Sequence, residues 1–144
     1  MFNPSRDQVR SFFIETWRKY LAKEVLTPME TIAADIIALH PEYHALVEDP
    51  DAIDRDFPPE AGQVNPFLHL SLHLAIEEQL SIDQPPGIRA AFEAACAYRG
   101  DRHDAMHDAL ECLGETLFSA QRNGAPPDGG AYVAALRRRA GLAL

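Results

Sequence analysis

The histidines are the residues of this sequence best suited to chemistry, because every one of them belongs to a pair with a spacing of four. The three pairs are His40 and His44, His69 and His73, and His103 and His107. In an α-helix, residues four apart lie on the same face, one turn from each other. Each pair can therefore present two imidazoles to a common ligand.

Two of the pairs belong to a longer shared pattern. The stretches "HLSLHLAIEE" (69–78) and "HDAMHDALEC" (103–112) both follow H-x-x-x-H-x-A-[I/L]-E, so that Glu77 and Glu111 extend the two stripes by one more turn. An imidazole or carboxylate buried without a partner costs several kcal/mol. A divalent metal offsets this cost, because neutral imidazole and ionised carboxylate are its natural ligands. The pattern therefore predicts a metal site in the core of a helical bundle.

The predicted ligand set contains eight side chains. They are His40, His44, His69, His73, Glu77, His103, His107 and Glu111. Within the first pair we expect His44 to be the better ligand, because Pro41 disturbs the helical geometry between the two histidines. Six nitrogens and two carboxylates exceed the four ligands of one tetrahedral zinc, and N/O ligation permits iron, manganese or zinc. We therefore expect a divalent metal, most consistent with two iron ions.

Such a nearly saturated centre favours binding of O₂ or NO, metal handling or redox chemistry over hydrolysis, which needs an open position with a bound water. Two other interpretations stay open. One is a metal-free helical adaptor, in which histidines and glutamates form hydrogen bonds and the 49–65 loop contacts a protein. The other is a zinc-dependent hydrolase that uses three histidines and a water. The pattern identifies no catalytic residue, so enzymatic activity is left open.

The elements that position these residues are predicted to be helices. Capping boxes begin the first helix at Ser5 and the second at Thr27, and Pro28 suits the first turn of the latter. The first expected helix runs from Ser5 to about 21, and its inner face holds Val9, Phe12, Phe13, Trp17, Tyr20 and Leu21. The second runs from Pro28 to about Leu39, with Ile32, Ile36 and Ile37 facing inward. The other expected helices are a short one from Pro41, one from Pro66, one from 88 to Gly100, one from Asp101 and a last one around 132–136.

The segment "FLHLSLHL" (67–74) alternates with period two, which is also typical of a strand. Its apolar residues are mostly leucine rather than β-branched, and "AIEEQL" continues it as a good helix former, so a helix is favoured. Residues 49–65 show no helical pattern and are expected to form a loop. We thus predict an all-α protein: an irregular antiparallel bundle of about six to seven helices, forming a single domain over 1–144.

Composition excludes several classes of protein. The net charge is −9, and the only basic run is Arg137–Arg139, so nucleic-acid binding is not expected. No apolar run approaches the length of a membrane span, and "MFNPSRDQVR" lacks the features of a signal peptide. The two cysteines, Cys96 and Cys112, match neither a metal motif nor a disulfide framework, which is typical of a reducing cytoplasm.

The chain also resembles a known family. The resemblance is carried by "LTPMETIAADIIALHPEYHALVEDPD" and by "NPFLHLSLHLAIEEQ", and the family is the bacterial domain of unknown function 1841. It implies a small bacterial cytoplasmic protein and brings no activity with it. In ligand type and helical setting, though not in spacing, the predicted metal ligands are similar to those of hemerythrin-like di-iron bundles.

Overall fold

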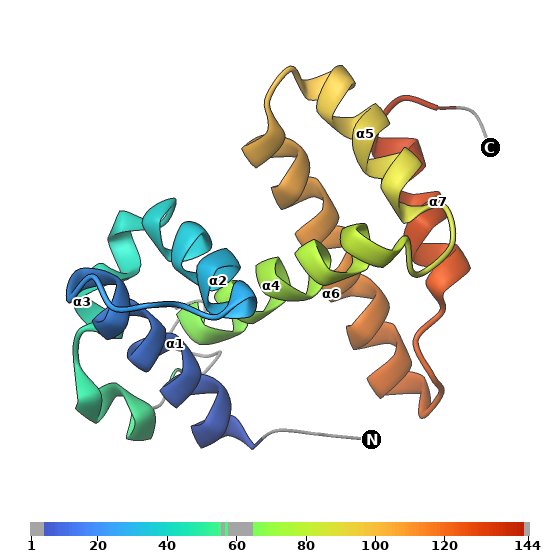
Figure 1. The fold of residues 1–144 in the computed structure, drawn as a ribbon. Helices are drawn as coiled ribbons and strands as arrows, with labels where there is room; N and C mark the ends of the chain where they lie inside the picture. The colour runs from blue at the N-terminus through green and yellow to red at the C-terminus, as the bar shows by residue number, and fades with distance from the viewer. Residues whose placement is uncertain (1–4, 56, 58–64, 143–144) are drawn as a thin grey trace. The chain divides into compact units, whose positions relative to one another are not determined.

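The computed structural model describes residues 5–55, 57 and 65–142. Within these residues the protein is all-α, as predicted, with seven α-helices, two short 3-10 helices and no strand (Figure 1). The chain divides into two compact units, 1–74 and 75–144. Because the division falls within one helix, the expectation of a single domain stays a prediction.

The first unit contains α1 (Arg6–Leu21), α2 (Pro28–Ala38), the 3-10 helix η1 (Pro41–Tyr43), α3 (His44–Val47) and the 3-10 helix η2 (Pro50–Asp54). The next helix, α4 (Pro66–Ile82), contributes residues to both units. The second unit continues with α5 (Ile88–Arg99), α6 (Arg102–Asn123) and α7 (Gly129–Arg139).

Local capping chemistry sets the starts of the first two helices. The Ser5 hydroxyl accepts the Gln8 N–H and the Gln8 side chain accepts the Ser5 N–H, which completes a capping box. Thr27 and Glu30 make the same reciprocal pair at the start of α2. Each box satisfies backbone donors that the first turn of a helix leaves without partners, so both predicted starts are confirmed.

The core of the first unit forms where α1 packs against α2, α3 and η2. Its buried members are Phe13, Trp17, Ala33, Ile36, Ile37, Leu46, Val47, Ala52, Phe67 and Leu70. The inner faces predicted for α1 and α2 are partly wrong. Ile32, Tyr20 and Leu21 are exposed, because Ala33, Ile36 and Ile37 already form the inward stripe of α2 and the core ends before the last turn of α1.

The region after α2 is more helical than expected. The predicted short helix from Pro41 is divided into η1 and α3, and η2 occupies part of the expected 49–65 loop. A buried side chain holds η2: Arg10 Nη1 donates to the carbonyls of Ala52, Ile53 and Arg55 at 3.3, 2.8 and 2.7 Å. Residues 56 and 58–64 of the expected loop lie outside the described residues.

The prediction of a helix over "FLHLSLHL" is confirmed, since α4 covers all of it. The Asn65 side-chain oxygen accepts the N–H groups of Phe67 and Leu68, which satisfies the first turn. The Ser71 hydroxyl donates to the Phe67 carbonyl at 2.7 Å, a contact with the preceding turn that is typical of serine within a helix. The helical register therefore places His69 and His73 on one face, one turn apart.

In the second unit, α5, α6 and α7 each pack against the other two (Figure 1). Gly100 ends α5 in the left-handed conformation with φ +74°, and the side chain of Asp101 begins α6 by accepting the Asp104 N–H at 3.2 Å. Asp128 caps α7 in the same way. The buried apolar side chains of these helices include Ile88, Phe92, Met106, Leu110, Leu113, Tyr132 and Leu136.

One ion pair ties two of these helices together. The Arg99 guanidinium on α5 donates to both carboxylate oxygens of Asp108 on α6, at 2.7 and 2.9 Å. The guanidinium holds the pKa of the buried Asp108 carboxyl below its usual range, although burial opposes this shift. None of the described helices is both long and apolar enough to cross a membrane.

Candidate metal centre

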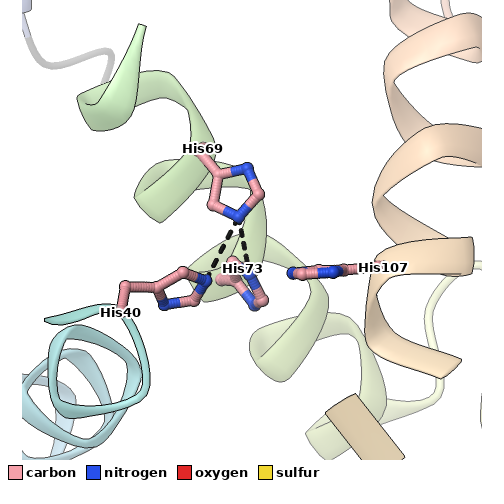
Figure 2. A group of neighbouring side chains, drawn as sticks. All are labelled: His40, His69, His73 and His107. Carbon is pink, nitrogen blue, oxygen red and sulfur yellow. Dashed lines mark hydrogen bonds between the residues drawn. The ribbon is translucent and has the colours of Figure 1, made fainter. Parts of the chain in front are cut away.

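Three histidines of the first unit direct the same ring nitrogen toward one another (Figure 2). His69 Nε2 lies 3.2 Å from His40 Nε2 and 3.1 Å from His73 Nε2. His40 and His73 are buried, and His69 is half-buried. The helical spacing of α4 accounts for two of these imidazoles, and the third comes from His40, which follows α2, precedes η1 and lies 29 residues earlier in the sequence than His69.

The orientation of His40 is fixed by the backbone. Its Nδ1 lies 2.8 Å from the Ile36 carbonyl oxygen, and because a carbonyl only accepts, Nδ1 carries the hydrogen. In a neutral ring this leaves the lone pair on Nε2, the atom that faces His69. Metal-binding histidines are commonly oriented in this way, with the second ring nitrogen donating to a backbone carbonyl.

Neutral imidazoles cannot supply a hydrogen to both nitrogen–nitrogen contacts. When His69 Nε2 carries its hydrogen, it can donate toward His40 or His73 but cannot accept from either. When it carries none, its lone pair faces that of His40. A ring nitrogen is either a donor or an acceptor in the neutral state, so one hydrogen at most serves the two contacts. A cation between the three nitrogens would satisfy all of them.

The distances suit such a cation. With zinc–nitrogen bonds of about 2.0–2.1 Å, tetrahedral geometry places neighbouring nitrogens about 3.3–3.4 Å apart. The two contacts of His69 are slightly shorter than this, and the ligand atoms of all three histidines lie within 4.8 Å of one another. The two contacts of His69 are therefore close to the spacing that a tetrahedral metal site requires.

Tyr43 covers one side of the three histidines. Its ring is nearly parallel to that of His40, with 6° between the planes and 5.5 Å between the centroids, and it meets His69 edge-on at 5.7 Å. Burial raises the pKa of the Tyr43 hydroxyl, so the phenol is neutral at ordinary pH. The ring adds packing that limits how far the two imidazoles can turn.

His44 occupies a different place from the one expected. Its Nε2 donates to the Ile37 carbonyl at 2.9 Å, and its ring packs on Trp17 with 4.6 Å between the centroids. Of these two histidines, His40 and not His44 belongs to the group that could hold a metal. The reason is that α2 ends at Ala38, so the spacing of four between these histidines does not follow one helical face.

The other predicted pair lies in the second unit. His103 and His107 both lie on α6, where their ring centroids are 4.3 Å apart, so the spacing of four does bring these two imidazoles together. Both are half-buried. Figure 2 also draws His107, which belongs to this unit rather than to the one that holds the other three histidines.

The two predicted carboxylate ligands are engaged by arginines of their own unit. Glu77 accepts from Arg102 at 2.8 Å, and Glu111 accepts from Arg139. Among the described residues, the group of side chains that could hold a metal contains only histidines. The two-carboxylate ligand set predicted from the sequence, and with it the likeness to hemerythrin-like bundles, is not confirmed.

The comparisons identify the chain at the level of its family. No curated protein and no solved structure matches it. Residues 5–138 match the family described as "Domain of unknown function (DUF1841)". Because this match covers nearly the whole sequence, including every histidine, the chain belongs to that family.

Proposed function

We propose that this protein binds a single divalent transition-metal ion through His40, His69 and His73. The observation that carries the proposal is the convergence of three Nε2 atoms at hydrogen-bond distance, with His40 oriented by the Ile36 carbonyl. The rings meet in a buried place where neutral imidazoles leave one contact without a hydrogen. A metal ion would replace those contacts with bonds to all three lone pairs.

One ion is favoured over the two irons expected from the sequence. A two-metal centre would require Glu77 and Glu111 to leave Arg102 and Arg139, whereas one ion requires no such change. Imidazole suits zinc, iron, copper and nickel. Three protein ligands leave positions open on the metal, which supports either O₂ or NO chemistry with iron or hydrolysis with zinc.

The proposal is tested on full-length protein purified without a polyhistidine tag. Dialysis against excess zinc, or anaerobically against Fe(II), followed by removal of free metal and elemental analysis, should give close to one ion per chain. His69→Ala and His73→Ala should lose it. His44→Ala is the matched control, because His44 lies in the same unit and its Nε2 is hydrogen-bonded to a carbonyl.

Metal retained equally by His73→Ala and the wild type would refute this site. Failure of the folded wild type to bind either ion would favour the metal-free adaptor. Circular dichroism of each variant establishes that loss of metal is not loss of helix. Loaded Fe(II) protein that develops new absorption with O₂ or NO would favour redox chemistry, and zinc-dependent hydrolysis of a model ester would favour the hydrolase.

A further inference from the structure

A second feature of the first unit is a cavity of about 420 Å³ beside η1. Its apolar lining includes Tyr43, Leu46, Phe57 and Pro66. Two of these residues are aromatic, so the cavity offers flat surfaces to a small apolar group. Ligand sites commonly combine such walls with a few charged or polar groups that fix orientation.

The cavity carries one charge of each sign. Arg55 and Glu42 both line it, and both are exposed. The Arg55 guanidinium lies 5.4 Å from the centroid of the Phe57 ring. Among the described residues, neither of these two charged side chains takes part in a salt bridge or a side-chain hydrogen bond, so both remain available to a ligand.

A buried arginine holds this part of the cavity in place. Arg10 donates to the Arg55 carbonyl at 2.7 Å, and its guanidinium lies 5.6 Å from the centroid of Phe57 and 5.1 Å from that of Phe67. The backbone that carries Arg55 is thereby fixed to α1. Tyr43, another residue of the lining, stacks on His40.

We propose that this cavity binds a small zwitterion with a flat apolar side chain, of the class of the aromatic α-amino acids. Arg55 would receive the carboxylate and Glu42 the ammonium group, while Tyr43 and Phe57 contact the ring. The proposal that this cavity binds a ligand does not depend on the proposed metal site. Any influence of the ligand on the metal rests on the proposed function, because Tyr43 is the residue that lines the cavity and contacts His40 and His69.

The experiment uses calorimetry with three probes on the full chain, both metal-free and zinc-loaded. L-phenylalanine carries both charges, 3-phenylpropionate lacks the ammonium group, and 2-phenylethylamine lacks the carboxylate. Arg55→Gln should weaken L-phenylalanine and 3-phenylpropionate about tenfold, since each loses a charge-assisted hydrogen bond, and should leave 2-phenylethylamine unchanged. Glu42→Gln should weaken L-phenylalanine and 2-phenylethylamine and leave 3-phenylpropionate unchanged.

Two variants serve as controls for the change of charge. Asp35→Asn removes an exposed acid of α2 outside the cavity, and Arg137→Gln removes a base of α7; neither should affect any probe. No binding of L-phenylalanine, or binding that both cavity variants leave intact, would overturn the proposal. Equal binding of L-phenylalanine and 3-phenylpropionate would overturn the proposal that the ligand is a zwitterion. Loss of metal binding with retained L-phenylalanine binding would refute the metal site alone.

Discussion

The two copies of the histidine pattern, one on α4 and one on α6, place their histidines in different surroundings. In the first, His69 and His73 of α4 meet a third imidazole, that of His40, which precedes η1. In the second, His103 and His107 of α6 contact each other. The shared spacing is thus sufficient to pair two imidazoles, but a third imidazole depends on a residue from another part of the chain.

The two copies of the pattern also agree in how their glutamates, Glu77 and Glu111, are paired. Each pattern ends in a carboxylate, and each carboxylate is held by an arginine, Arg102 for Glu77 and Arg139 for Glu111. A helical register tells which side chains share a face, whereas the partner of each side chain depends on where other helices place their charges. The position of a glutamate one turn beyond a histidine is therefore weak evidence for ligation.

The largest expected difference between the two patterns is in metal affinity. His73→Ala should weaken zinc binding at least a hundredfold, because it removes a ligand, and even the groups that orient ligands typically contribute about 10–100-fold. His103→Ala should change it much less. Competition with a chromophoric chelator measures both. An equal loss in the two variants would remove the proposed distinction between His103 and the histidines of the first unit.

Metal should also stabilise the native protein. A ligand that binds only the native state adds about 4 kcal/mol when its free concentration is a thousandfold above Kd. Chelation should therefore lower the melting temperature of the wild type and have little effect on the His69→Ala/His73→Ala variant. Trp17 is the only tryptophan and lies in the first unit, so its fluorescence reports unfolding there, while circular dichroism reports all the helices.

The same two signals test the expected single domain. If the units unfold together, as that expectation requires, the fluorescence and circular dichroism transitions should coincide, and metal should shift both equally. A circular dichroism transition that separates into two steps, of which only the one coincident with Trp17 fluorescence responds to metal, would show that the units unfold independently.

Within the second unit, Asp108→Ala should destabilise the fold by about 2 kcal/mol, because it removes the buried acceptor of two hydrogen bonds from Arg99. Glu115→Ala is the matched control. Its side chain is 71% exposed and lies 3.7 Å from Arg139, and an ion pair of this kind contributes about 0–1 kcal/mol. Urea unfolding of both variants measures the difference, and similar losses would contradict the importance of the buried pair.

The first unit offers a smaller test. Thr27→Ala should cost about 1 kcal/mol, because the hydroxyl that accepts the Glu30 N–H is lost at the start of α2. Thr27→Ser keeps the hydroxyl and should retain most of the stability. The midpoint of urea unfolding followed by Trp17 fluorescence measures the effect. Equal destabilisation by serine and alanine would assign the effect to the lost methyl group instead.

Most of the helices can be predicted because their signals are local. Ser5, Thr27, Asp101 and Asp128 act within three residues of themselves, and the leucine content and helical continuation of α4 distinguish it from a strand.

The arrangement of the site requires contacts that no local pattern contains. The 3-10 helix η2 is held by Arg10, more than 40 residues away, and His40 meets His69 across a separation of 29 residues. The spacing of four between histidines does identify every histidine of the group that could hold a metal. It cannot show that Glu77 pairs with Arg102, since that contact joins residues on different helices.

The smallest expected effect is on the pH dependence of the first unit. The backbone N–H of Thr27 and then Lys19 hold the pKa of Glu30 below its ordinary value of 4.5, while burial opposes the shift. A carboxyl with a lowered folded pKa stabilises the protein above its unfolded pKa, and that contribution is lost as pH falls through the folded value. Glu30→Gln should therefore be less stable than the wild type at pH 7, and the difference should shrink below pH 4.5. Urea midpoints measured by Trp17 fluorescence from neutral to acidic pH test the sign, and a difference that grows on acidification would contradict it.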